Sequence, residues 1–155
     1  MKILVIAILL MQAMQVVAQD TKKGIIIENA RIKNIPPTSS ITAGYMLIRN
    51  KTNKDINLIK VESDISRLVE MHSVNIENGI MKMRQVKSIL IKANRTTELK
   101  SGDFHIMFIN LRSPLKKGDK KKIQLYFDNG IKENLEMQVE DIEMTKEDKN
   151  KHDHL

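Results

Sequence analysis

The sequence has no cysteine and no tryptophan, and it contains only two tyrosines and three phenylalanines. Without cysteine the protein cannot form disulfides, thiolate zinc sites, iron–sulfur clusters or a blue-copper centre, and it has no cysteine nucleophile. The scarcity of aromatic rings argues against a surface that stacks nucleic-acid bases, despite a formal net charge of +7. We therefore expect no nucleic-acid partner, and we interpret the lysines between residues 116 and 122 as a solvated turn beside an edge strand.

The sequence does contain enough apolar material for one folded domain. Of its 155 residues, 41% are hydrophobic and 29% are charged, so the chain can bury one core and hardly two. Its ten methionines outnumber all of its aromatic residues together. Because a thioether is a soft donor as well as an adaptable apolar group, these methionines are candidates for metal ligands and for core residues alike.

The first 18 residues have the pattern of a cleavable secretory signal. Lys2 supplies a positive start, residues 3–11 form an unbroken apolar run, and Val16 and Ala18 precede an expected cleavage site. The apolar run is too short for a comfortable membrane span, which needs about 20 residues. We expect removal of residues 1–18, a periplasmic mature protein without a cysteine-linked lipid, and no stable membrane insertion after cleavage.

The rest of the chain consists of short runs rich in β-branched residues, separated by turn residues such as glycine, proline, asparagine and aspartate. We expect about nine strands, at residues 24–33, 42–50, 55–62, 68–76, 80–86, 88–99, 104–111, 122–127 and 131–139. This spacing, with no helical period, predicts an all-β antiparallel sandwich or barrel. The folded domain is expected over residues 19–139, followed by a polar, disordered tail at residues 140–155.

Two of the four histidines lie close to a methionine in this pattern. In a strand through residues 104–111, His105 and Met107 point to the same face, with Cα atoms roughly 6.5–7 Å apart. Phe104, Ile106 and Phe108 then face the core. A thioether and an imidazole are thereby expected to project together from a well-anchored strand.

The dipeptide Asn78-Gly79 is the strongest short hairpin signal, and it sets the register of the strands around it. If these two residues form the loop, Val74 pairs with Met83 and His72 pairs with Gln85. His72 and Met83 then become diagonal neighbours on one face, about 7–8 Å apart. Met81 shares that face but lies further from His72, so Met83 is the better partner.

Each histidine–methionine pair combines a borderline nitrogen donor with a soft sulfur donor, a set that suits Cu(I). Zinc and calcium prefer ligands that this pattern does not supply, and we find no acidic residue at an obvious spacing to His72 or His105. Core packing of the methionines and ordinary hydrogen bonding of the histidines remain the alternative for each pair. Two such pairs in one small exported domain favour the metal.

The residues resemble a known family at this point. Ten residues separate His72 from Met83, and twenty-one residues separate Met83 from His105-Ile106-Met107. This spacing is similar to the His-(Met)-x10-Met-x21-His-x-Met motif of periplasmic copper chaperones of the PCu(A)C type. Flanking residues agree, and the resemblance covers residues 26–139. It implies a cupredoxin-like Greek-key β-sandwich or barrel that binds one Cu(I) through His72, Met83, His105 and Met107. The optional methionine after the first histidine is Ser73 here.

The resemblance also implies a partner, which is a copper-accepting oxidase subunit with a dinuclear copper site or another copper chaperone. We expect no enzymatic turnover, because no paired acid–base constellation is evident. The alternatives are an exported β-sandwich adhesion or interaction module without a metal site, and a metal-dependent enzyme. In the tail, His152-Asp153-His154 offers nitrogen and oxygen donors that suit Cu(II), although a merely solubilising tail is equally compatible with the composition.

Overall fold

The computed structural model describes residues 24–142, and this part of the chain is built from β-strands without a helix. The strands are β1 (Ile25–Lys33), β2 (Ile41–Asn50), β3 (Ile56–Ser63), β4 (Ser66–Glu77), β5 (Ile80–Gln85), β6 (Ile89–Ile91), β7 (Thr96–Leu99), β8 (His105–Leu111), β9 (Lys120–Phe127) and β10 (Lys132–Glu140). The expectation of an all-β protein is confirmed. No helix among residues 24–142 is long and apolar enough to cross a membrane.

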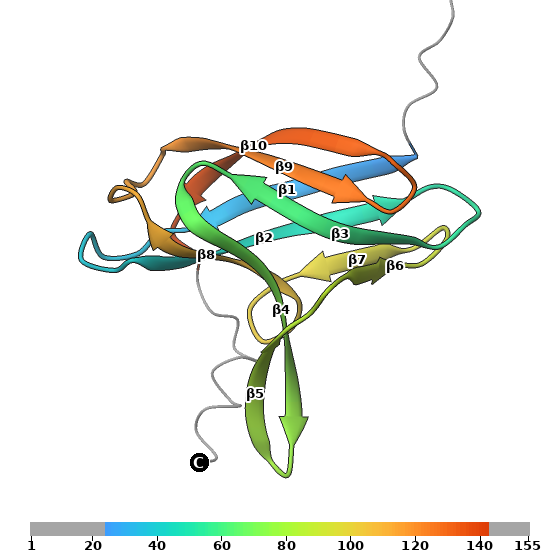
Figure 1. The fold of residues 1–155 in the computed structure, drawn as a ribbon, viewed down its shortest axis with the longest axis horizontal. Helices are drawn as coiled ribbons and strands as arrows, with labels where there is room; N and C mark the ends of the chain where they lie inside the picture. The colour runs from blue at the N-terminus through green and yellow to red at the C-terminus, as the bar shows by residue number, and fades with distance from the viewer. Residues whose placement is uncertain (1–23, 143–155) are drawn as a thin grey trace, which may run out of the picture.

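The strands form one sheet that curls around a common core. Their order is β5-β4-β8-β2-β1-β10-β9-β3-β6, with β7 paired to β2. The pairing of β1 with β10 is parallel, and the other described pairings are antiparallel. Strand β6, at the end of this order, contacts β7, since the Thr97 hydroxyl of β7 donates a hydrogen bond to the Leu90 carbonyl of β6 at 3.1 Å. Figure 1 shows the resulting flattened barrel, with the β4–β5 hairpin projecting from one side.

Alternation of side chains along the strands builds this core. In β9, Ile123, Leu125 and Phe127 are buried, whereas the residues between them point outward. In β8, Ile106 and Phe108 are fully buried, as the alternation predicts. The predicted inward face of β8 is therefore confirmed, and its opposite face is left for His105 and Met107. Phe104 precedes the strand and packs against the core as a partly buried residue.

The hairpin of β4 and β5 has the predicted register. Asn78 and Gly79 have φ angles of 54° and 79°, the left-handed conformation that a two-residue type I′ loop requires. Val74 pairs with Met83 and His72 pairs with Gln85 across the two strands. The diagonal placement of His72 and Met83 on one face is thus confirmed.

Two details of the sequence prediction were wrong. Residues 88–99 form two strands, β6 and β7, because a turn interrupts them at Asn94, which has a φ of 54°. Asparagine tolerates this conformation well, and the Asp55 carboxylate accepts a hydrogen bond from the Ala93 backbone nitrogen at 2.8 Å. Strand β9, which follows the lysine-rich turn, is no edge strand, since β10 and β3 pair with its two sides.

The folded part of the chain extends past residue 139, into the range expected for the tail. Glu140 ends strand β10, where its carbonyl accepts a hydrogen bond from the Asn34 nitrogen at 2.7 Å. Asp141 accepts hydrogen bonds from the Asn34 side chain at 2.8 Å and from Lys117 at 2.5 Å. These two acidic residues belong to the folded part because they join three segments of it. The expected signal at residues 1–18 and the tail histidines His152 and His154 lie outside the described residues.

Candidate metal centre

The candidate site lies on the outer face of the sheet where β5, β4 and β8 are adjacent. On β8, His105 and Met107 project to this face because Ile106 and Phe108 occupy the core face. Met107 is half-buried, whereas His105 is only 3% exposed. The expectation that His105 projects away from the core is met, but its side chain is enclosed by its neighbours.

The second histidine comes from the neighbouring strand. His72 of β4 is the direct cross-strand partner of His105. Their imidazole rings have centroids 5.9 Å apart and planes inclined by 43°. Residues opposite one another in adjacent strands project to the same face, so the two imidazoles lie side by side on that face of the sheet, covered for the most part by their neighbours.

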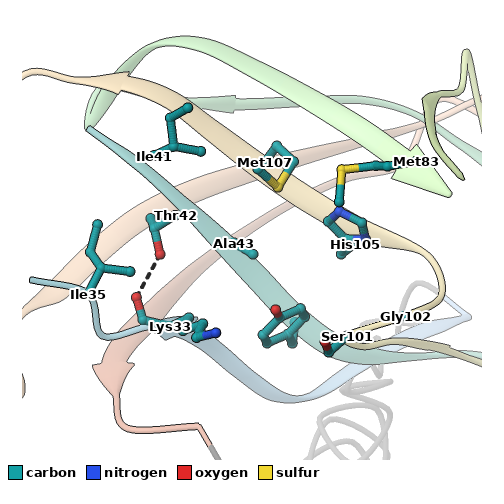
Figure 2. Close-up of a pocket in the computed structure, with 11 residues that line it drawn as sticks. Lys33, Ile35, Ile41, Thr42, Ala43, Met83, Ser101, Gly102, His105 and Met107 are labelled. Carbon is teal, nitrogen blue, oxygen red and sulfur yellow. Dashed lines mark hydrogen bonds between the residues drawn. The ribbon is translucent and has the colours of Figure 1, made fainter. Parts of the chain in front are cut away.

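Met83 of β5 completes the set from the projecting hairpin. Its side chain is 53% exposed, although it is large and apolar. Met83, His105 and Met107 line one shallow cavity of about 250 Å³, together with residues of β2 and of the loop before β8. Figure 2 shows the Met83 side chain extending over His105, and it shows Met107 further along β8, the strand that carries His105. Three of the four side chains singled out from the sequence thus line one cavity, and His72 is not among its lining residues but lies beside His105 on the neighbouring strand.

The environment of His105 favours a neutral imidazole. Burial lowers the pKa of His105, and this effect outweighs the hydrogen bond to the Asp103 backbone, which raises it. Its Nδ1 lies 2.8 Å from the Asp103 backbone carbonyl, a group that only accepts hydrogen bonds. Nδ1 therefore carries the proton of the neutral ring.

The environment of His72 contains a carboxylate that sequence reasoning missed. His72 Nε2 lies 2.6 Å from Glu70 Oε2, and both side chains are mostly buried, at 15% and 17% exposed. The expectation of no acidic residue at a useful spacing to His72 was wrong. The available signal was the two-residue separation, which places Glu70 and His72 on one face of a strand.

The candidate site differs from an ordinary cluster of imidazole and carboxylate ligands. Within residues 24–142, no group of three or more histidine, cysteine, aspartate or glutamate side chains is placed to hold a metal ion. A set of two imidazoles and two thioethers would suit soft, monovalent copper better than zinc, calcium or magnesium.

Comparison with known proteins places this chain in a family. The family model described as "Putative lipoprotein LpqE-like" matches residues 25–139. The chain belongs to the LpqE-like family. Two curated relatives are the uncharacterized protein RP573 of Rickettsia prowazekii, 29% identical over 107 residues, and the "Putative lipoprotein Lxx21020" of Leifsonia xyli subsp. xyli, 28% identical over 105 residues. The matches cover 68% and 67% of this chain but only 59% and 63% of the relatives.

Solved structures similar to this LpqE-like protein are copper-binding domains. The copper-bound PCuAC domain from PmoF2 superposes with a TM-score of 0.66 at 18% identity, over 77% of this chain and 94% of that domain. The solution structure of CuI-DR1885 from Deinococcus radiodurans has a TM-score of 0.64 at 25% identity, over 83% of this chain and 85% of that one. The expected cupredoxin-like barrel is confirmed by this likeness.

Proposed function

We propose that this LpqE-like protein is an exported copper chaperone that binds one Cu(I) through His72, Met83, His105 and Met107. The observation that carries the proposal is the placement of the four side chains on one face of the sheet, with His72 opposite His105 and with Met83, His105 and Met107 lining one cavity. The likeness to the Cu(I) form of DR1885 supports the same metal and oxidation state. Softness of the sulfur donors favours Cu(I) over Cu(II), which prefers nitrogen and oxygen ligands.

The chemistry of this donor set suits transfer of the ion. Neutral imidazoles and thioethers leave the positive charge of Cu(I) uncompensated, so an acceptor with thiolate ligands can take the metal away. Met83 is half exposed, which gives an acceptor direct access to one of the ligands. The proposed acceptor is the dinuclear copper site of a cytochrome c oxidase subunit, or a second copper chaperone. The protein performs no turnover in this scheme and only carries the ion.

The leader-like pattern of residues 1–18 supports export of the protein. The family description and the name of the Leifsonia relative both contain the word lipoprotein, which denotes a class of exported proteins. These names support a function outside the cytoplasm for this chain as well. We propose the periplasm as the compartment in which copper is bound and passed on.

The proposal is tested by anaerobic titration with Cu(I), followed by native mass spectrometry and X-ray absorption. We expect one copper ion per chain and a first shell of mixed nitrogen and sulfur. A protein that takes up no copper would instead be the metal-free adhesion or interaction module considered above. A shell of oxygen alone would remove the four side chains from the site.

A separate Cu(II) site is proposed for the C-terminal segment on its sequence alone, because His152, Asp153 and His154 offer nitrogen and oxygen donors. Deletion of residues 151–155 is expected to abolish a Cu(II) binding event and to leave Cu(I) binding unchanged. Titration calorimetry of the full-length and truncated proteins measures both. Identical Cu(II) isotherms would show that the tail binds no copper.

A further inference from the structure

The histidine–carboxylate pair on β4 points to a role for Glu70 that the ligand set does not include. Glu70 and His72 project from the same face of the strand, and Glu70 Oε2 lies 2.6 Å from His72 Nε2. In the register of the sheet, Glu70 is also the cross-strand partner of the proposed ligand Met107. The carboxylate therefore lies next to the proposed site, where it contacts the proposed ligand His72.

The pairing dictates which nitrogen of His72 carries the proton. An ionised carboxylate only accepts hydrogen bonds, so Nε2 of a neutral imidazole must donate to Glu70. The other nitrogen, Nδ1, then has a free lone pair. Among the side-chain nitrogen and oxygen atoms of residues 24–142, His72 Nδ1 is the one that is buried without any hydrogen-bond partner.

A buried acceptor without a partner is costly, and native proteins seldom keep one without a reason. His72 lies on the strand face shared with His105 and Met83, and a free lone pair on that face supplies a reason, because it can bind a metal. His105 has the opposite arrangement, since its Nδ1 donates to the Asp103 carbonyl and its Nε2 remains available. The hydrogen bonds thus leave a different nitrogen free in each of the two rings.

We propose that Glu70 is a positioning residue for copper, which keeps the proton of His72 on Nε2 and so directs Nδ1 to the ion. The Asp103 carbonyl does the converse for His105, which binds through Nε2. This inference rests on the proposed function and adds the donor atoms to it. Metal-binding histidines commonly use their second nitrogen in this way, and loss of such a partner typically costs 10–100-fold in metal affinity. Glu70 itself stays outside the coordination sphere, because its oxygen is engaged by His72 and is a hard donor.

The first test needs no copper. Long-range ¹H–¹⁵N correlation spectra of the metal-free, ¹⁵N-labelled protein, recorded where the imidazoles are neutral, identify the protonated nitrogen of each histidine. We expect Nε2–H for His72 and Nδ1–H for His105. Glu70→Gln should keep the Nε2–H form, since the amide oxygen accepts the same hydrogen bond, whereas Glu70→Ala should give a mixture. An Nδ1–H form of His72 in the wild type, or no change in Glu70→Ala, would overturn the proposal.

The second test measures Cu(I) affinity by competition with a chelator. We expect Glu70→Ala to weaken binding about 10–100-fold and Glu70→Gln to weaken it less. Glu77→Ala is the matched control, because Glu77 lies on the same strand but on the other face, where it pairs with Lys82 and Arg84. Unchanged Cu(I) affinity in Glu70→Ala would overturn the role proposed for Glu70 but not the proposed copper binding. A wild-type protein that takes up no Cu(I) would overturn the proposed function, whatever tautomer the spectra show.

Discussion

At the scale of single residues, the proposed ligands differ in how much of the fold depends on them. Met83 is 53% exposed, so its side chain contributes little to packing. His105 is 3% exposed and hydrogen-bonded to the Asp103 carbonyl, so its removal affects the fold as well as the site. Substitution of Met83 is therefore the cleaner probe of copper binding.

We predict that Met83→Leu strongly lowers Cu(I) affinity and leaves the free energy of unfolding nearly unchanged. Leucine retains the apolar volume of the side chain but has no sulfur donor. Met81→Leu is the control, because Met81 lies on the same face of the same strand and is not a proposed ligand. Copper competition and urea denaturation of the metal-free proteins measure both quantities. Equal affinities for the two variants would exclude Met83 from the site.

At the scale of the elements, the β4–β5 hairpin is the part of the fold on which the site depends most. It carries His72 on one strand and Met83 on the other, so their relation is fixed by the loop at Asn78 and Gly79. Among the strands of residues 24–142, β5 lies at the edge of the sheet and pairs with β4 alone. A change in the loop can therefore displace Met83 without disturbing the barrel.

We predict that Gly79→Ala lowers Cu(I) affinity and costs about 1 kcal/mol of stability, because a side chain at a positive φ is strained. No atom lies within 4 Å of the added Cβ, so the cost is one of backbone conformation alone. Gly118→Ala is the matched control, with a φ of +90° and equally open surroundings in the turn before β9. It should lose similar stability in urea denaturation but bind Cu(I) normally. A normal affinity in Gly79→Ala would show that the loop does not position Met83.

The start of β3 is attached to the turn after β9 by a carboxylate. Asp128 accepts hydrogen bonds from the Asn57 side chain at 2.8 Å and from the Asn57 backbone nitrogen at 3.0 Å. These bonds, the side-chain one foremost, hold the pKa of Asp128 below its usual value of 3.8. As the pH falls below that value, the unfolded chain binds the proton first, so the stability due to Asp128 declines.

We therefore predict that Asp128→Ala is less stable than the wild type near neutral pH, and that the difference narrows below about pH 4. Urea denaturation of the metal-free proteins between pH 7 and pH 3 measures the two curves. Curves that stay parallel down to pH 3 would show that the ionised carboxylate contributes nothing. Copper is absent from this experiment, so the histidines of the site do not enter the comparison through metal binding.

At the scale of the whole molecule, local signals in the sequence predicted more than non-local ones. Asn78-Gly79 fixed the hairpin register, and alternation in β8 placed His105 and Met107 on the outer face, because both are properties of neighbouring residues. The division of residues 88–99 into two strands depends on a turn at Asn94 and on a contact with Asp55, 38 residues away from Ala93. The burial of His105 likewise depends on the surrounding loop and strands.

The parallel pairing of β1 with β10 has no local signal either, since it joins the first and last described strands. Glu70 was missed for another reason. Two-residue separation from a histidine is common in any strand, and only the observed 2.6 Å contact distinguishes this carboxylate from an exposed one. Sequence reasoning thus identified the candidate ligands but not the residue that orients one of them.

Closure of the barrel depends on one fully buried polar side chain, that of Asn50 at the end of β2. Its amide nitrogen donates to the carbonyls of Lys54 and Ile91 at 2.7 and 3.0 Å. Its oxygen accepts from the Thr52 backbone nitrogen and hydroxyl at 2.9 and 2.7 Å. The side chain is completely buried, and its hydrogen bonds join β2, the loop after it and the last strand of the sheet order, β6.

We predict that Asn50→Ala lowers the free energy of unfolding by about 3 kcal/mol, because it leaves the buried Ile91 carbonyl and two part-buried backbone groups without these partners. Asn134→Ala is the control, since Asn134 is exposed and makes one hydrogen bond, with Gln124 on the outer surface. That variant should remain within about 0.5 kcal/mol of the wild type. Asn50 contacts β6 at one end of the strand order, and the proposed copper site lies near β5 at the other end. Asn50→Ala should therefore bind Cu(I) normally under conditions in which the variant is folded. Urea denaturation measures the stability of the variant, and a copper competition titration measures its Cu(I) affinity. A variant that is still folded at low temperature but has lost Cu(I) affinity would contradict this independence of core and site.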